Sequence, residues 1–250
     1  MKIEFSQIMD YVKCPIIYLI KNVYGITNED LNTQFQREMK KVINHFFFRV
    51  MDNTIVSVDV LKNKWEALWF DSKGIELEDV LFRHHETKTK MGYQGVNMIE
   101  NFHRANYDDP GVPLAVDFDY EVPIGKHIVT GTLDLVREIK EGYAKMVEVV
   151  HFSTSNYVPD EWETKTNLYT TLQSYAFRKE FQTKEQRLTY YLLKTGKTIS
   201  TIRSPDDFSR LENFVDFVCT CIDANLFYPR PTYICRSCAV KEFCEQWGVK

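Results

Sequence analysis

Residues 127–137 read HIVTGTLDLVR, an alternation of apolar and polar side chains that predicts a β-strand. The stretches on either side alternate in the same way, LAVDFDYEV at 114–122 and AKMVEVVHF at 144–152. Two short turn sequences separate them, PIGK at 123–126 and EG at 141–142. The three segments therefore predict a three-stranded meander in the middle of the chain.

Helical patterns precede and follow this meander. Those before it are expected at 6–12 with Ser6 as the N-cap, from Pro15 to near Gly25, at 31–51, at 58–70 with Ser57 as the N-cap, and from the loop at 84–88 to about residue 107. After it we expect a helix at 162–181, strands at 187–193 and 199–202, and a helix at 206–225. This order predicts an α/β domain in which helices flank a mixed sheet.

The composition limits the class of protein. A chain of 250 residues with 44% apolar residues can form one large domain with a sizeable core. No apolar run approaches the roughly 20 residues that a membrane span needs, and the first residues do not resemble a signal peptide. We therefore expect a cytoplasmic protein. The net charge of −4 means that a nucleic acid would have to be held by a local basic surface.

Three of the six cysteines lie close together near the C-terminus. Cys235, Cys238 and Cys244 have the spacing C-x2-C-x5-C, and Cys14 is the most obvious source of a fourth thiolate. Four thiolates suit either a tetrahedral zinc ion or a four-thiolate iron–sulfur cluster. Such a site would form a four-cysteine clasp (Cys14, Cys235, Cys238 and Cys244) between the two ends of the chain. We interpret Cys219 and Cys221, two residues apart on a predicted helix, as core or surface residues.

Two acidic residues lie on adjacent strands of the meander, Asp134 in the second and Glu148 in the third. Carboxylates from neighbouring strands can share one hard cation, and Mg²⁺ or Mn²⁺ there would activate water and polarise a phosphate. The alternative is that both are ordinary acidic residues of a strand.

The two ends of the chain resemble the iron–sulfur branch of the RecB-like nucleases, within the PD-(D/E)XK superfamily. The resemblance is carried by Tyr11-x2-Cys14-Pro15-x2-Tyr18 and by the C-terminal cysteine spacing. That branch includes the CRISPR-adaptation nucleases and the nuclease domain of bacterial AddB. The resemblance implies a restriction-endonuclease-like core and a [4Fe–4S] cluster on the clasp, which favours iron–sulfur over zinc. It extends over a single domain, 1–250, with N-terminal helices at 1–30, a helical region at 31–110, the nuclease-like core at 111–205, and the last helix and cysteines at 206–250.

The same resemblance assigns family positions within the core. The patterns G-x-x-D, (D/E)-x-K and Q-x-x-x-Y place the catalytic residues at Asp134, Glu148 and Tyr175, with Asp134 and Glu148 binding Mg²⁺ or Mn²⁺. Three positions depart from the family: Val96 replaces a histidine, Val150 replaces the lysine, and Thr171 replaces the glutamine. Losing one member of a cooperating catalytic set removes most of the rate, so weak or absent nuclease activity is expected.

Other polar residues could compensate for these losses. The nearest in sequence are His103, Lys145, His151 and Gln173. Helix rise and strand alternation predict that each lies too far away or faces away from the site.

Three functions therefore remain open. The favoured one is a nuclease-like protein of DNA replication, recombination or repair that acts as a DNA-binding or structural subunit, beside a partner such as a helicase. Basic and aromatic residues near the clasp would contact DNA, as single strands or duplex ends: Arg230, Tyr233, Arg236, Lys241 and Trp247. The alternatives are an active Mg²⁺- or Mn²⁺-dependent DNA exonuclease with a rearranged site, and a zinc-clasped interaction module without a nucleic-acid role.

Overall fold

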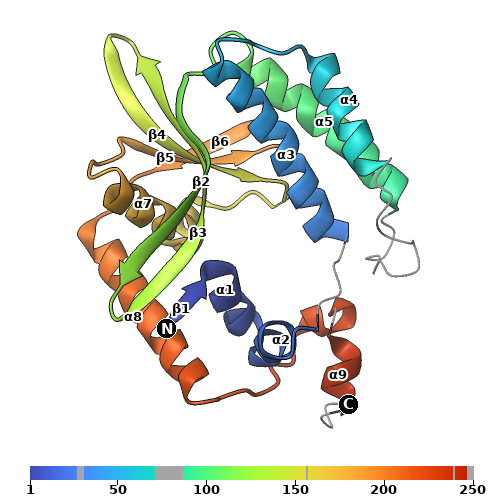
Figure 1. Ribbon diagram of the computed structural model, residues 1–250, viewed down its shortest axis with the longest axis vertical. Coiled ribbons are helices and arrows are strands. Elements are labelled where there is room, and N and C mark those ends of the chain that lie inside the picture. Colours follow the sequence, from blue (N-terminus) through green and yellow to red (C-terminus); the bar gives the residue numbers. More distant parts are fainter. Residues whose placement is uncertain (27–30, 71–86, 156, 239, 247–250) are drawn as a thin grey trace.

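A mixed β-sheet with helices on both of its faces forms the centre of the molecule (Figure 1). The computed structural model describes residues 1–26, 31–70, 87–155, 157–238 and 240–246. Its strands follow the order β1-β3-β4-β5-β6, and β2 pairs with β3. Their bounds are β1 Lys2–Glu4, β2 Val112–Ile124, β3 His127–Glu141, β4 Ala144–Ser153, β5 Arg187–Leu192 and β6 Lys197–Thr201. The predicted α/β class, with helices flanking a mixed sheet, is confirmed.

The meander is confirmed, and two parallel pairings make the sheet mixed. Strands β2, β3 and β4 pair antiparallel, whereas β1 runs parallel to β3 and β4 runs parallel to β5. Strand β1 has three residues, too few to show an alternating pattern, and for that reason the sequence did not predict it.

One face of the sheet, called the α3 face here, is covered by α3 Leu31–Met51, α4 Val58–Trp69 and α5 Lys88–Asn106. An apolar stripe of α3 is buried, with Phe35, Met39, Val42 and Phe46 at 4% exposure or less. The expected start of α5 at 84–86 lies outside the described residues. Helix α5 packs closely on α4, because a Cβ atom at Gly95 would lie 2.3 Å from the Trp65 ring.

The opposite face, called the α7 face, is covered by α1 Phe5–Lys13, α7 Leu168–Glu180 and α8 Pro205–Asp223. Helix α1 is capped by Glu4, in a reciprocal pair with Gln7, and not by Ser6. The single helix predicted at 162–181 is wrong. Asn167 has an extended backbone (ψ 116°), so the segment divides into α6 Glu161–Thr166 and α7, and the Asn167 side chain caps α7 by accepting the Thr170 N–H.

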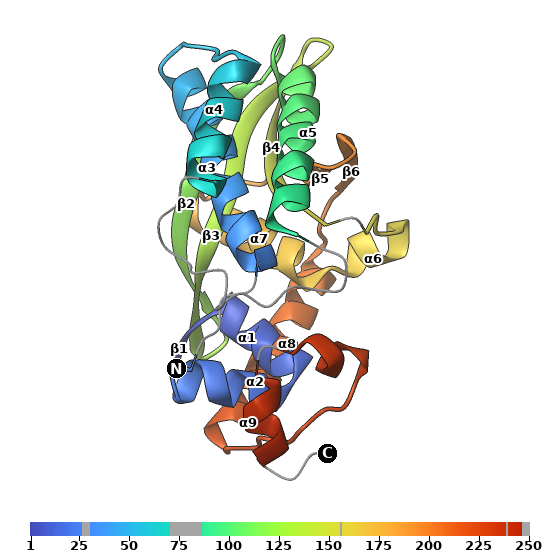
Figure 2. The same cartoon turned by 90° about the vertical axis from the view of Figure 1, so that its right-hand side faces the viewer.

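The two ends of the chain meet below the sheet (Figures 1 and 2). Here α2 Pro15–Tyr18 and the π-helical turn Leu19–Val23 pack against α9 Lys241–Gln246, which follows the 3-10 turn Tyr233–Ser237. The Tyr11 hydroxyl donates to the Leu226 carbonyl at 2.7 Å, and Arg230 Nη1 donates to the Val12 carbonyl at 2.7 Å. Among the described residues, no helix is both long and apolar enough to cross a membrane.

Candidate functional site

Both carboxylate oxygens of Asp134, in β3, are engaged in hydrogen bonds or ion pairs. Its Oδ2 is 2.7 Å from His151 Nδ1 and accepts the Phe152 N–H at 3.1 Å. Its Oδ1 lies 3.3 Å from Lys40 Nζ. Burial alone would raise the pKa of Asp134, but the His151 hydrogen bond and the nearby charges of His151 and Lys40 outweigh it and hold the pKa below its ordinary value. The carboxylate therefore stays ionised at neutral pH, with its charge already balanced.

Glu148 of β4 lies on the other face of the sheet. The β3–β4 register pairs Leu135 with Val150 and Val136 with Val149, so residue 134 stands opposite His151. Directly opposed residues share a face, and neighbours along a strand alternate. His151 lies with Val149 on the α7 face, whereas Glu148 points to the α3 face. Asp134 stands where the alternation of β3 is interrupted, because Leu133 and Val136 both belong to the α7-face core, and it contacts His151 as well as Lys40 of α3.

The contacts of Glu148 agree with this placement. Its Oε2 accepts from Arg137 Nε at 2.8 Å, and its Oε1 accepts from the Thr189 hydroxyl at 2.5 Å. Arg137 in turn donates to Asn106 of α5 at 2.9 Å. In this structure the Glu148 carboxylate is thus engaged in a buried ion pair with Arg137, and the cation shared by Asp134 and Glu148 stays a prediction.

The other predicted family positions also lie away from Asp134. Val150 is fully buried in the core of the α3 face, and Val96 packs against that same core. Thr171 accepts a hydrogen bond from Arg203 Nε at 2.7 Å. The Tyr175 hydroxyl donates to the Pro123 carbonyl at 2.9 Å, and burial together with the charge of Glu212 raises the pKa of Tyr175 to about 12. The structure does not bring these residues together with Asp134.

The residues around Asp134 were missed or set aside in the sequence. The His151 ring lies 4.6 Å from the Tyr169 ring and 5.2 Å from the Tyr190 ring, and the Tyr190 hydroxyl donates to Ser153 Oγ at 3.0 Å. Beside Asp134, the spacing (D/E)-x-K falls on His151 and Ser153. A signal for this was present, because the short turn after Glu141 pairs residue 141 with 144, and counting outward pairs 134 with 151.

A lysine takes the place expected for a cation. Lys40 Nζ lies 2.8 Å from Asp117 Oδ1 and 3.3 Å from Asp134 Oδ1. Asp117 has a positive φ of 52° and stands opposite Asp134 in the β2–β3 register, in which Val116 pairs with Leu135 and Phe118 with Leu133. Burial would lower the pKa of Lys40, but the two carboxylates outweigh it and raise the pKa, so the ammonium stays charged.

This donor set does not suit a divalent cation. Mg²⁺ and Mn²⁺ prefer several oxygen ligands, whereas here the second acidic position is a histidine and an ammonium lies between the two aspartates. Within the described ranges, no group of three histidine, cysteine or acidic side chains is arranged to hold a metal ion.

The other polar residues that could compensate do not supply the missing catalytic side chains. His103 Nε2 lies 2.9 Å from the Val56 carbonyl, and Lys145 pairs with Glu138 at 2.7 Å. Gln173 is fully buried on α7, and neither atom of its amide makes a hydrogen bond of normal geometry. Its side chain lies near the Tyr169 hydroxyl.

The cysteines of the predicted clasp gather at one end of the molecule. Cys14, Cys238 and Cys244 pack partly against an apolar cluster that includes Ile16 and Val240. Burial raises the pKa of Cys238, and the nearby thiols of Cys14 and Cys235 raise it further. Cys235 is exposed, and its Sγ accepts the Thr232 N–H at 3.3 Å. The thiols are neighbours, but they do not form a closed ligand set in this structure.

The basic and aromatic residues expected to contact DNA near the clasp differ in their exposure and in their contacts. Tyr233 is 88% exposed, whereas Arg230 binds the backbone of α1. Arg236 and Lys241 are exposed, and Trp247 lies outside the described residues.

Comparisons with known proteins identify the family of this chain. A search of curated protein sequences finds no match. Among solved structures, one titled "Crystal structure of SSO0001" is 15% identical over 62% of this chain and 69% of that chain, with a TM-score of 0.33. The family model of the PD-(D/E)XK nuclease superfamily matches residues 3–245, nearly the whole chain. The chain therefore belongs to the PD-(D/E)XK nuclease superfamily.

Proposed function

We propose that this protein is a RecB-like member of its superfamily with weak or no nuclease activity, acting as a DNA-binding or structural subunit in DNA replication, recombination or repair. The observation that carries this proposal is the position of Lys40 Nζ between Asp117 and Asp134. Metal-dependent hydrolysis needs a divalent cation to generate hydroxide and to offset the charge of the phosphate. An ammonium ion neutralises the carboxylates but cannot activate water.

The placement of the second acidic residue supports the same conclusion. A cation held at Asp134 would need further oxygen ligands, whereas β4 presents His151 to Asp134 and Glu148 is bound to Arg137. Freeing both carboxylates for a metal ion would break the contacts of Asp134 with His151 and Lys40 and the ion pair of Glu148 with Arg137.

The test is digestion of single- and double-stranded DNA with Mg²⁺ or Mn²⁺, comparing the natural protein with Asp134→Ala. We expect equal, background-level cleavage from both proteins. Cleavage by the natural protein that disappears in Asp134→Ala would overturn the proposal and favour the alternative, a metal-dependent exonuclease with a rearranged site.

The four-cysteine clasp is part of the same proposal. Cys14, Cys235, Cys238 and Cys244 would hold a [4Fe–4S] cluster with a structural role, and thiolates are the usual ligands of such clusters. The gathering of these cysteines beside one apolar cluster supports it. A brown protein with stoichiometric iron and sulfide is expected when purification excludes oxygen. A colourless protein containing zinc would instead favour the zinc-clasped interaction module.

A further inference from the structure

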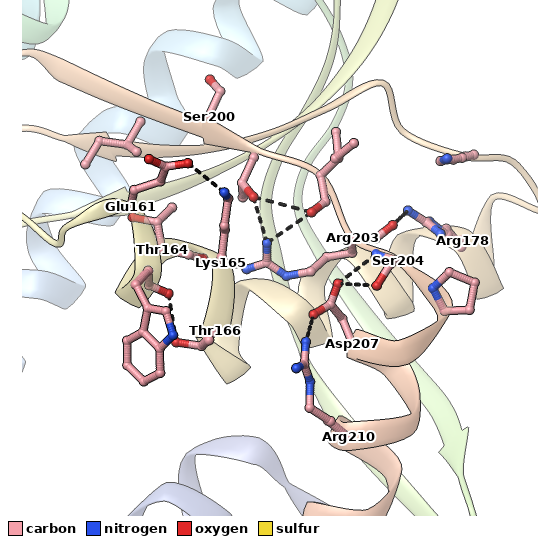
Figure 3. A pocket seen from close by; sticks show the side chains of 16 residues that line it. Glu161, Thr164, Lys165, Thr166, Arg178, Ser200, Arg203, Ser204, Asp207 and Arg210 are labelled. Carbon is pink, nitrogen blue, oxygen red and sulfur yellow. Dashed lines mark hydrogen bonds and ion pairs between the residues drawn. The ribbon is translucent and has the colours of Figure 1, made fainter.

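A cavity of about 880 Å³ opens between α6, β6 and the N-terminal turn of α8 (Figure 3). It lies at the β6 edge of the sheet, and neither Asp134 nor any cysteine lines it. The cavity therefore differs from both sites described above.

Its walls carry more positive than negative charge. Among the described residues, five cationic side chains line it, Lys165, Arg178, Lys184, Arg203 and Arg210, against the two carboxylates of Glu161 and Asp207. These carboxylates are already paired, Glu161 with Lys165 at 2.6 Å and Asp207 with Arg210. Arg178 is paired outside the lining, with buried Glu185 at 2.8 Å. Within the part of the chain that the structure describes, no ion pair engages Lys184 or Arg203.

Arg203 is the more informative of these two residues. It is 2% exposed, and its guanidinium donates only to neutral oxygens, including the Thr171 hydroxyl at 2.7 Å, the Thr164 carbonyl at 2.8 Å and the Thr170 hydroxyl at 2.9 Å. These bonds fix the guanidinium without cancelling its charge. The nearby carboxylates of Asp207 and Glu185 act on Arg203 through space, but they are bonded to Arg210 and Arg178. Burying a charge without a directly bonded counter-charge is costly, and an anion in the adjoining cavity would offset part of that cost.

The rim of the cavity adds exposed apolar surface. Trp162 of α6 is 71% exposed and Ile202 after β6 is 64% exposed, and both line the cavity. A small inorganic anion would leave this surface unused. A cationic groove beside an exposed aromatic ring is the combination that binds single-stranded nucleic acid, because phosphates contact the cations and a base stacks on the ring.

We propose that this cavity is a binding site for single-stranded nucleic acid, in which a backbone phosphate lies near Lys184 in the field of Arg203 and a base stacks on Trp162. This inference rests on the nucleic-acid-binding part of the proposed function. It does not depend on hydrolysis, because Asp134 takes no part in it.

The test is fluorescence anisotropy of a labelled oligothymidylate of about 12 nucleotides, a length within the usual site sizes, titrated with the full chain at low salt in EDTA. Lys184→Glu should bind more weakly. A plot of the logarithm of its association constant against the logarithm of salt concentration should be less steep, by about 0.7 for one lost phosphate contact. Trp162→Ala should bind roughly 5- to 150-fold more weakly through loss of stacking. Both side chains are exposed, so neither change should alter folding.

Lys140→Glu is the matched control, because it makes the same charge change at an exposed position that does not line the cavity. It should bind as the natural protein does. Wild-type affinity in either Lys184→Glu or Trp162→Ala would overturn the cavity site while leaving the proposed function standing, as would an equal loss in Lys140→Glu. Absence of binding by the natural protein would overturn both the site and the nucleic-acid role.

Discussion

At the scale of single residues, the partners of Asp134 decide its chemistry. Its carboxylate is bound by His151 and Phe152 and faces Lys40, so it contributes to stability instead of presenting free oxygens to a metal ion. A motif match identifies an acidic residue but not the charges around it.

We predict that Asp134→Asn destabilises the protein by about 1–3 kcal/mol at neutral pH, because Lys40 and His151 lose a buried, charged partner. The folded-state pKa of Asp134 lies below its unfolded value of 3.8, so its contribution is fully present above that value. The contribution is lost as the pH falls through the lower, folded-state pKa. The difference between the two proteins in urea unfolding should therefore be largest near pH 7 and shrink below about pH 4. A difference that does not vary with pH would show that the network does not stabilise the fold.

Val150→Lys is predicted to destabilise the protein without restoring cleavage. Val150 is fully buried in an apolar core, so the new ammonium would lose its hydration without gaining a partner. A loss of about 3–5 kcal/mol is expected, measured by thermal unfolding. A stable Val150→Lys protein that cleaves DNA with Mg²⁺ would contradict both the face assignment and the proposed loss of activity.

The double change His151→Glu with Ser153→Lys is the complementary variant. It places a carboxylate and an amine at the (D/E)-x-K spacing beside Asp134. The double change is combined with Lys40→Ala, which removes the competing ammonium. We expect this combined variant to bind Mn²⁺, as measured by calorimetry. The matched control is Lys40→Ala alone, which should bind Mn²⁺ more weakly because it lacks the second carboxylate.

At the scale of the elements, two glycines of α5 allow close helix packing. Gly95 lies against the Trp65 ring, and a Cβ atom at Gly92 would lie 2.3 Å from the Phe70 ring. The Trp65 indole also donates to the Gly92 carbonyl at 2.9 Å. These glycines let α5 approach α4, a role in packing.

Gly95→Ala is predicted to destabilise the protein by about 1–3 kcal/mol, although alanine favours a helix more than glycine does. The added methyl group would overlap the Trp65 ring, so α4 and α5 would have to separate. Asn97→Ala, at an exposed position of the same helix, is the control and should change the free energy of unfolding by less than about 0.5 kcal/mol. Equal effects of the two changes in urea unfolding would show that the packing is looser than described.

At the scale of the whole molecule, the two ends of the chain hold one another through protein contacts. The bonds from Tyr11 to Leu226 and from Arg230 to Val12 join α1 to the C-terminal segment, and the Tyr18 and Phe227 rings stack 6.0 Å apart. A cluster on the cysteines would add a covalent link to a corner that is already packed.

Cys14→Ala is predicted to release iron and to lower the melting temperature, because metal binding by a folded site contributes directly to folding free energy. Cys221→Ala removes a thiol of similar burial that lies outside the clasp, so it should retain the iron content of the natural protein. Iron retained in Cys14→Ala, with an unchanged melting temperature, would contradict the clasp.

The features that the sequence predicted and those that it missed differ in their physical origin. Apolar periodicity along one segment predicted the long helices, the meander and the α/β class, because period is a local property of the chain. The break at Asn167 was missed because the apolar pattern continues across it. The pairing of Asp134 with His151 was missed because a motif fixes spacing along a strand and not the register between strands.

The sequence was sufficient to identify the long helices before the meander, the three strands of the meander and the C-terminal cysteine spacing, since each depends on residues close together in the chain. Tertiary contacts determined that Asp134 faces Lys40 and His151, that Glu148 binds Arg137, and that Arg203 is buried beside a cationic cavity. Each of these depends on strand register or on segments far apart in sequence. The charge and burial of such a residue are properties of its neighbours, and folding alone brings those neighbours together.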